Sequence, residues 1–413
     1  MHFLRESLFV LVLMYVFLYY QSPLFTDYIL LALVVLGIYL FLISNMSKKP
    51  ILFFLVLSVA IPFISWWLLR LQLPEAASAY PKSSFLTSLF IFVPVAIGIN
   101  AETRKILILC VTFVLSLLLM PWVSGNGWQE IQSGLSGNRV DFNLTNAQHT
   151  GMLLGVAILM LLVFFRPWVL ECNKRPIRLA LWLFSFGVIV TFFMFTQLRA
   201  GLLSLAVVTG ILFIIWMKEA NFKVRFLIIF ALIFSMVAIS FLPASKKVID
   251  RFAKEWDTVV TLPYMNPQDV STDNVGARFH LWRFAIEHAL DRPLTGWDRR
   301  GDSFLLSNND EIQRYTDRLY HFHNAYLSLW IAYGLLGFLF YLALILWLGK
   351  KVYNYYYNER VMPKDIFVFL CLFFLYFALI NGFEEYIFYD SGIFILSIVI
   401  GILYSFELKK NST

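Results

Sequence analysis

The sequence predicts an all-α polytopic membrane protein with about twelve transmembrane helices and one large, partly helical loop outside the membrane. Of the 413 residues, 60% are hydrophobic and only 14% are charged, whereas a typical soluble domain has about 25% charged residues. The mean hydropathy is +0.73. Apolar segments of about 20 residues, the length that crosses a bilayer, recur along the chain. These observations exclude a soluble enzyme.

Twelve apolar segments fit transmembrane helices. They span residues 4–21, 28–45, 51–69, 84–100, 105–123, 149–166, 178–197, 200–217, 225–243, 324–349, 365–381 and 391–407. They predict three parts: transmembrane helices 1–9 over residues 1–243, a large loop over 244–323, and helices 10–12 over 324–413.

The distribution of Lys and Arg predicts the orientation. Most of these residues fall in the loops on one side, while the short loops on the other side hold only Arg70, Lys82, Arg139 and Arg199. Cytoplasmic loops are enriched in Lys and Arg, so both termini are expected in the cytoplasm and the large loop on the outer face.

The large loop has nearly balanced charge, which argues against a nucleic-acid-binding surface. From Gly276 to Leu290 it has the periodicity of an amphipathic helix that ends before Pro293 and Gly296. We expect this helix to lie against the membrane domain on an apolar stripe of Trp282, Ala285, Ile286, Ala289 and Leu290.

Two arginines are candidates for an anion-binding site on the outer face. Arg199 lies in the tight turn between two apolar segments, beside the N-terminus of the eighth span, where free N–H groups favour anions. Arg278 starts the loop helix on the side of Trp282. A guanidinium suits phosphate because it is a planar fork of donors that keeps its charge. Contacts with lipid headgroups or an acidic neighbour remain the structural alternative for both.

The segment His321-Phe322-His323-Asn324 precedes the tenth span. A metal site would need further ligands, and neither His280 nor His288 has suitable spacing, so we predict no metal. One alternative is a pair of interfacial histidines bonded to water. The other is a general base: a helix N-terminus disfavours imidazolium, so His323 would stay neutral and could accept a proton. Together with two guanidiniums, it suits glycosyl transfer from a lipid diphosphate.

Three segments carry a resemblance to the O-antigen ligase family of bacterial inner-membrane glycosyltransferases, which is related to the O-antigen polymerases. Arg199 to Leu203 fits an Arg-x3-Leu pattern. Arg278 and Trp282, followed by Pro293-Leu294-Thr295-Gly296, fit a second pattern, which is an Arg and a Trp followed by Pro-Leu-x-Gly. The third pattern is a His, a small polar residue, nine intervening residues and Gly-x-x-Gly. It fits His323-Asn324 and Gly334-Leu335-Leu336-Gly337.

The resemblance implies a GT-C-like glycosyltransferase in the bacterial inner membrane with a periplasmic active site. It implies metal-independent, inverting transfer of a glycan from undecaprenyl diphosphate to a sugar hydroxyl of the lipid A-core. His323 would be the general base, and Arg199, Arg278 and Arg139 would bind the diphosphate. His321 and Asn324 would support them. The partners are the carrier-linked glycan, the lipid A-core and membrane lipids; no cofactor is expected.

One departure concerns Asp298, where the family often has Gly, and it puts the local turn in doubt. Gly334 and Gly337 are expected to allow close helix packing and so to position His323. The alternatives in function are an O-antigen polymerase that joins carrier-linked repeat units, a protein-directed glycan transferase, and a transporter or flippase for anionic lipids. The short loop from Pro121 to Gln148 favours the ligase over the polymerase.

Overall fold

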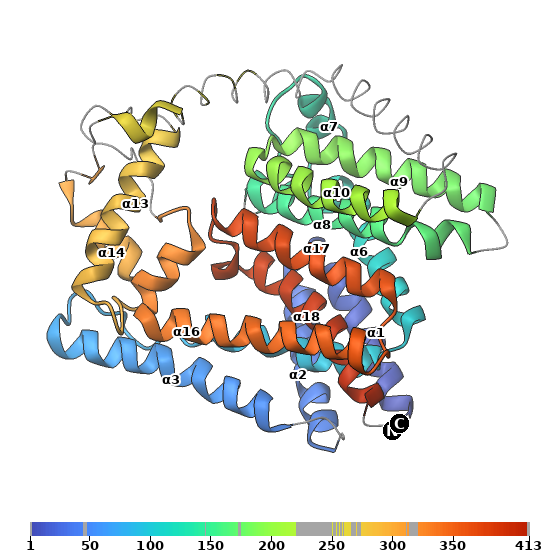
Figure 1. Cartoon of the computed structure of the whole chain (residues 1–413), viewed down its shortest axis with the longest axis horizontal. Helices are drawn as coiled ribbons and strands as arrows, with labels where there is room; N and C mark the ends of the chain where they lie inside the picture. Colours follow the sequence, from blue (N-terminus) through green and yellow to red (C-terminus); the bar gives the residue numbers. More distant parts are fainter. Residues whose placement is uncertain are drawn as a thin grey trace.

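The computed structural model describes residues 2–43, 48–144, 146–171, 175–219, 274–310, 312–313 and 321–410, together with positions 250, 253, 256, 258, 260–265 and 270. These residues form helices joined by short loops, with no strand among them. The helices that Figure 1 labels are α1 (His2–Leu18), α2 (Pro23–Ile43), α3 (Lys48–Gln72), α6 (Thr103–Val123), α7 (Trp128–Leu135), α8 (Ala147–Val163), α9 (Arg175–Thr196), α10 (Arg199–Glu219), α13 (Asn274–Asp291), α14 (Gly301–Ser307), α16 (Ala325–Tyr353), α17 (Lys364–Asn381) and α18 (Asp390–Lys410).

Shorter helical segments complete the described chain. They are α4 (Ser84–Thr87), η1 (Ser88–Ile91), α5 (Phe92–Ile99), η2 (Arg166–Leu170), η3 (Leu262–Tyr264), η5 (Asn354–Asn358) and η6 (Tyr386–Phe388).

Each predicted span that falls on described residues coincides with helical structure. Eight helices in the described chain are long and apolar enough to cross a membrane, which confirms a polytopic membrane protein. The ninth predicted span, 225–243, lies outside the residues that the structure describes.

The shorter apolar helices lie in the centre of the bundle. All residues of α5 and nearly all of α8 are buried, and α18 is buried along its whole apolar length. Helix α5 packs against α18, and α8 packs against α9. These helices contact protein on all sides, so their apolar residues form a core, while longer outer helices such as α2 and α3 expose apolar side chains.

The predicted loop helix is confirmed as α13, but the predicted stripe is partly wrong. Ala285 and Ala289 are buried, whereas Ile286 and Leu290 are 44% and 61% exposed. Leu281, which was not predicted, is fully buried. The helix is rotated from the expected orientation because it packs against α16, and its buried residues form one apolar cluster with Leu305 and Leu306 of α14 and Ile331 of α16.

A break in α16 joins this helix to the loop that follows α13. Gly334 has φ +59°, outside the helical region, and the N–H of Leu335 donates to the carbonyl of Pro293 at 2.8 Å. A Cβ on Gly334 would lie 2.4 Å from the carbonyl carbon of Leu294. Gly334, expected to allow close helix packing, therefore permits a left-handed residue and close contact with the Pro-Leu-Thr-Gly segment.

Asp298 makes a turn after the Pro-Leu-Thr-Gly segment without a glycine at its own position. Asp298 has φ +59°, a left-handed conformation that favours glycine. Its buried carboxylate accepts hydrogen bonds from the backbone N–H of Ser78, at 3.2 Å, and from the Ser78 hydroxyl. These hydrogen bonds hold the Asp298 side chain in place in the left-handed turn.

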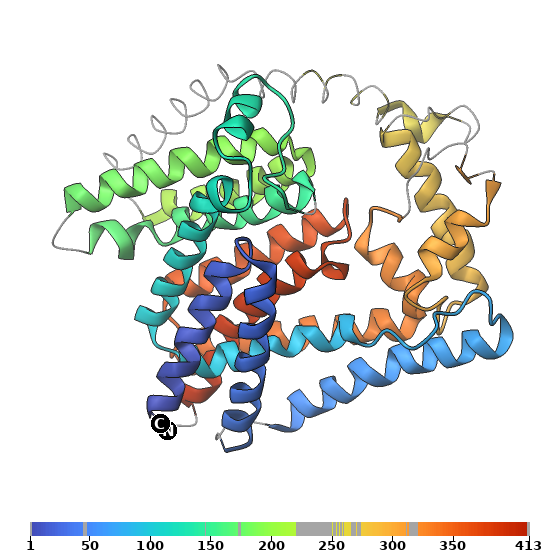
Figure 2. The same ribbon diagram turned by 180° about the vertical axis from the view of Figure 1, so that it is seen from behind.

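Helices α13 and α14 lie at one end of α16, as Figure 1 shows, whereas both chain termini lie at the opposite side of the molecule. Figure 2 gives the same arrangement from behind, with α1 and α2 packed side by side. The turn between α9 and α10, the start of α16 and the segment between α17 and α18 all fall on the side of α13. We call this the α13 end of the bundle.

Candidate active site

A cavity of about 530 Å³ lies at the α13 end. Four charged residues, Arg139, Arg199, Arg278 and Glu384, line it. Most of the other lining residues are apolar, among them Leu203, Phe279, Trp282 and Phe383. The three arginines that the sequence analysis selected therefore line one cavity, which we call the arginine cavity.

Backbone pairing between two loops sets the positions of Arg139 and Arg199. The N–H of Val140 donates to the carbonyl of Phe195 at 3.1 Å, and the guanidinium Nε of Arg139 donates to the carbonyl of Thr196 at 3.2 Å. Gln197 makes the turn with φ +50°, and its side-chain amide donates to the carbonyl of Gly137 at 3.0 Å. Because of this pairing, Arg139 comes beside the first residue of α10, which is Arg199.

Helix α13 brings Arg278 to the same cavity and also holds the histidine segment. The indole N–H of Trp282, one turn after Arg278, donates to the carbonyl of Phe322 at 2.9 Å. The backbone N–H of Phe322 donates to the carboxylate of Glu385 at 3.0 Å. Phe322 itself is fully buried. The segment that bears His321 and His323 is thus fixed on both sides.

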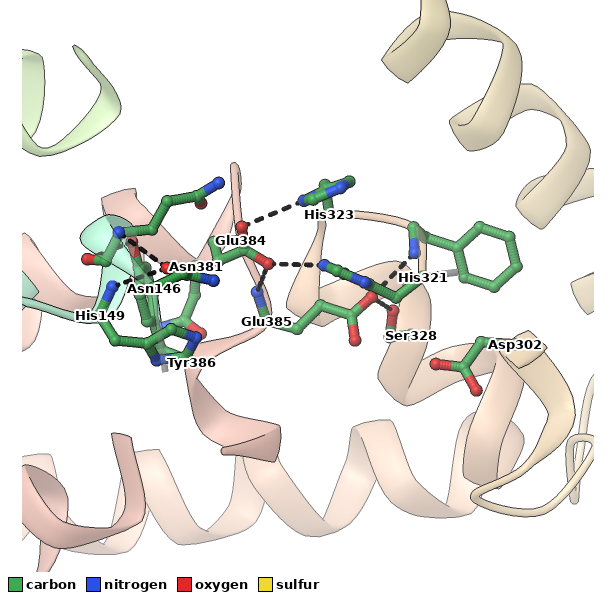
Figure 3. Close-up of polar contacts among 12 residues, drawn as sticks. Asn146, His149, Asp302, His321, His323, Ser328, Asn381, Glu384, Glu385 and Tyr386 are labelled. Atoms are coloured by element: carbon green, nitrogen blue, oxygen red, sulfur yellow. Dashed lines mark hydrogen bonds and ion pairs between the residues drawn. The ribbon is translucent and has the colours of Figure 1, made fainter. Parts of the chain in front are cut away.

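Glu384 lies between the two histidines, as Figure 3 shows. Its Oε1 is 2.9 Å from Nε2 of His321, and its Oε2 is 3.0 Å from Nδ1 of His323. The two imidazole centroids are 3.9 Å apart. His323 and Glu384 are both more than 90% buried. We call these three residues the His–Glu–His cluster.

The chain conformation around His323 is strained and then capped. His323 has φ +51°, which is unusual for a residue with a side chain. The side chain of Asn324 then caps α16 by accepting from the N–H groups of Tyr326, at 3.0 Å, and Leu327, at 3.2 Å. The cap and the contacts of Phe322 keep His323 in this conformation.

The two histidines have opposite pKa shifts. Burial alone would lower the pKa of His321, but the hydrogen bond with Glu384 and the charges of Glu385 and Glu384 outweigh burial and raise it. Burial also lowers the pKa of His323. The hydrogen bond and charge of Glu384 raise this pKa, but they do not outweigh burial together with the charges of His321 and Arg278, so the pKa of His323 is lowered. His321 therefore favours imidazolium, and His323 favours the neutral imidazole.

Glu384 stays ionised in this cluster. Burial would raise the pKa of its carboxyl, but the hydrogen bonds with His321 and His323 outweigh burial and hold that pKa well below its ordinary value. An ionised carboxylate can only accept hydrogen bonds, so Nδ1 of the neutral His323 carries the proton. Its Nε2 is then left as a proton acceptor.

The same three side chains could also hold a metal ion, since their ligand atoms all lie within 4.8 Å of one another. From the sequence, only His280 and His288 could be tested by spacing as further ligands. Glu384 could not, because it is 61 residues away from His323. His280 and His288 instead contact the backbone carbonyls of Val270 and Phe284.

The structure brings together some of the residues predicted from the sequence and not others. Arg139, Arg199 and Arg278 meet in one cavity, while His323 reaches that cavity through Glu384 and is not among the residues that line it. Glu384 and Glu385 were not predicted from the sequence. A pattern for them exists: two adjacent acids interrupt the apolar sequence between the last two spans, on the outward side in the predicted topology.

The fold and this site define an integral membrane protein with an arginine-lined cavity beside a histidine–carboxylate cluster. The model of the family described as O-Antigen ligase matches residues 184–342, which include Arg199, Arg278 and His323. The chain therefore carries an O-antigen ligase family domain, and the resemblance seen in the sequence is confirmed. No curated protein matches the chain.

The matched domain indicates the general type of function. It supports a glycosyltransferase-like function of the O-antigen ligase or polymerase type. The family implies, in general, lipid-linked glycan and lipid A-core as substrates. Arg139 and the Glu384–Glu385 pair lie outside the matched residues.

Proposed function

We propose that the protein is an O-antigen ligase that transfers a glycan from undecaprenyl diphosphate to a sugar hydroxyl of the lipid A-core, by metal-independent inverting displacement. The observation that carries the proposal is the joining of two features: three arginines line one cavity, and Glu384 of that cavity holds His323. In this proposal the protein lies in the bacterial inner membrane, its termini are cytoplasmic and the α13 end is periplasmic.

Arg139, Arg199 and Arg278 bind the diphosphate of the donor. Guanidiniums neutralise its charge and form bidentate hydrogen bonds with its oxygens. The charge on the leaving phosphate grows as the glycosidic bond breaks, so fixed cations stabilise the transition state more than the bound donor. The apolar walls at Leu203, Phe279 and Phe383 suit the first isoprenoid units of the carrier.

His323 is the general base. Its Nε2 removes the proton from the acceptor hydroxyl, whose oxygen forms a bond to the anomeric carbon of the donor sugar. The bond between that carbon and the diphosphate oxygen breaks, and its electron pair leaves with the diphosphate. Attack from the face opposite the leaving group inverts the anomeric configuration. Glu384 fixes the tautomer of His323 and stabilises the imidazolium that forms.

The experiment is transfer by purified protein from a glycan-bearing undecaprenyl diphosphate to lipid A-core. We expect His323→Ala to lower the transfer rate by about 100-fold or more, because a general base contributes about that much. His288→Ala, the same change on α13 outside the cluster, should keep the rate of the unmodified protein. Full activity of His323→Ala would refute the assignment of the base.

The polymerase of the same superfamily would use the same chemistry with a second carrier-linked glycan as acceptor. A deletion strain separates the two. Loss of a ligase leaves long chains on the carrier, whereas loss of a polymerase leaves a core that bears at most one repeat unit. Purified protein that moves lipid across a bilayer without releasing lipid diphosphate would instead indicate a transporter.

A further inference from the structure

A second cavity, of about 510 Å³, lies next to the His–Glu–His cluster. Four segments line it: residues before α5, the start of α14 with the two residues before it, His321 ahead of α16, and the segment from Glu385 into the start of α18. Its walls are mostly polar. They include Lys82, Arg299, Arg300, Asp302, Ser303, His321, Glu385 and Tyr389. We call it the polar cavity.

Neighbouring residues line the two cavities. Glu384 lines the arginine cavity, and its neighbour Glu385 lines the polar cavity. His321 lines the polar cavity and is hydrogen-bonded to Glu384 at 2.9 Å. Figure 3 shows Glu384 and Glu385 as neighbours in the chain, with the ring of His321 bonded to Glu384 and near the side chain of Glu385. Each cavity is therefore lined by a different member of the His–Glu–His cluster, Glu384 in the arginine cavity and His321 in the polar cavity.

The two cavities differ in chemistry. The arginine cavity combines three guanidiniums with apolar walls, which suits an anionic lipid headgroup. The polar cavity contains charges of both signs. Arg299 lies 3.4 Å from the carboxylate of Asp302, and its guanidinium carbon lies 4.5 Å from the ring centroid of Phe388. Alternating donors and acceptors beside aromatic rings suit the hydroxyl groups of a sugar better than a bare phosphate.

The acidic side of the polar cavity is held in place by the cluster segment. Glu385 accepts hydrogen bonds from the backbone N–H of Phe322, at 3.0 Å, and from the hydroxyl of Ser328. Burial and the nearby charge of Asp302 raise the pKa of Glu385 to about 7.

We propose that the polar cavity is the acceptor site, which binds the sugar residues next to the hydroxyl that is glycosylated. The acceptor and the lipid diphosphate then approach the His–Glu–His cluster from opposite sides. This inference rests on the proposed function. It adds no chemical step: the hydroxyl proton passes to His323 and the diphosphate leaves with the electron pair, as described above.

Two serines on α14 allow a matched test. Ser303 and Ser307 are both exposed, but of the two only Ser303 lines the polar cavity. We expect Ser303→Trp to fill the cavity and to raise the KM for lipid A-core by about tenfold or more, with the KM for the lipid diphosphate donor unchanged. Ser307→Trp should leave both KM values unchanged. Equal acceptor KM values for the two variants would overturn the inference.

A binding measurement separates this inference from the proposed function. Calorimetry with core oligosaccharide, and no donor present, should detect binding to the unmodified protein and to Ser307→Trp and weaker binding to Ser303→Trp. That result supports the acceptor site even if transfer is not seen, in which case only the proposed function fails. Equal binding by all three proteins overturns the site even if transfer is observed.

Lys82→Glu serves as a second variant if Ser303→Trp does not fold. Lys82 is exposed and lies on another wall of the polar cavity, so its replacement should not disturb packing. We expect a rise in the acceptor KM of about threefold to tenfold, equivalent to the loss of one hydrogen bond. An unchanged acceptor KM in this variant would also count against the site.

Discussion

The two ends of the helix bundle both contain partly buried charges, but they use them differently. At the end that holds the chain termini, Lys105 lies 2.6 Å from Glu6 and 2.9 Å from Glu102, and Lys351 lies 2.6 Å from Glu407. These contacts join α6 to α1 and α16 to α18. Each ammonium is neutralised by carboxylates at short distance, so these charges fasten helices together.

At the α13 end, three guanidiniums and one carboxylate line the same cavity. That carboxylate, Glu384, is already hydrogen-bonded to two imidazoles. Among the residues that the structure describes, the lining of this cavity therefore has an excess of positive charge, which suits an anionic ligand. The comparison suggests that charges at one end act in stability and charges at the other end act in binding and proton transfer.

Among the variants that test this comparison, loss of an arginine from the cavity should have the largest effect. We expect Arg278→Gln to lower kcat/KM for the lipid diphosphate donor by about 100-fold, since one charged donor to the leaving group is removed. The charge of Arg278 lowers the pKa of His323, so its loss should also move the acidic limb of the pH–rate profile to higher pH.

Arg283→Gln is the control for this variant, because Arg283 is on the same helix, is exposed and pairs with Glu287 at 2.9 Å. It should behave as the unmodified protein does. If Arg278→Gln and Arg283→Gln have the same donor kinetics, the arginine cavity does not bind the diphosphate.

Glu384→Gln should move the acidic limb of the pH–rate profile to lower pH, the opposite direction from Arg278→Gln. Transfer requires neutral His323, so the rate rises as pH passes through the pKa of His323, which lies below the ordinary histidine value. The hydrogen bond and charge of Glu384 raise that pKa, and their removal should move the limb to lower pH. We also expect the maximal rate to fall by about tenfold to 100-fold, because the imidazole loses its orienting partner.

A pH–rate profile of the purified variant measures both effects. Glu384→Asp keeps the negative charge and should recover part of the rate and of the pH profile. A limb that moves to higher pH in Glu384→Gln would contradict the arrangement of the cluster.

Loss of an ion pair at the terminal end should affect stability and little else. Lys351→Met leaves the carboxylate of Glu407 buried without its ammonium partner, a change that costs about 3–5 kcal/mol. We expect a lower Tm in detergent and unchanged KM values for donor and acceptor. A changed donor KM at normal Tm would show that the two ends are not separate in function.

Metal removal should have no effect on transfer. The His–Glu–His cluster could hold an ion, but the proposed mechanism needs Nε2 of His323 as a free base. Treatment with a chelator, followed by metal analysis of the protein, should leave the transfer rate unchanged. Loss of activity that zinc restores would instead assign His321, His323 and Glu384 as metal ligands.

Sequence patterns predicted the fold class because crossing a bilayer is a local requirement. A helix must present about 20 apolar residues whatever its neighbours are, so spans such as α6 and α17 could be found from the chain alone. The bounds of α13 were also predictable from its periodicity. Its buried face was not, because that face depends on the start of α16 and on α14, with which it forms a common apolar cluster.

Within the site, too, some features could be predicted from the sequence and others depend on tertiary packing. Arg199, Arg278 and His323 could be selected from the sequence because charged groups at the membrane surface are few and lie in recognisable patterns. Glu384 could not be paired with His323, since 61 residues separate them. The positive φ of His323 and the break at Gly334 depend on backbone contacts between distant segments.

By itself, then, the sequence determined that this chain is a bundle of apolar helices with a few cations and histidines at the outward face, since hydrophobic length and charge are properties of each segment. Only the tertiary structure decided that three arginines line one cavity, that a glutamate joins two histidines, and that a polar cavity lies behind them. Those are relations between side chains from separate helices, and packing alone brings them within hydrogen-bond distance.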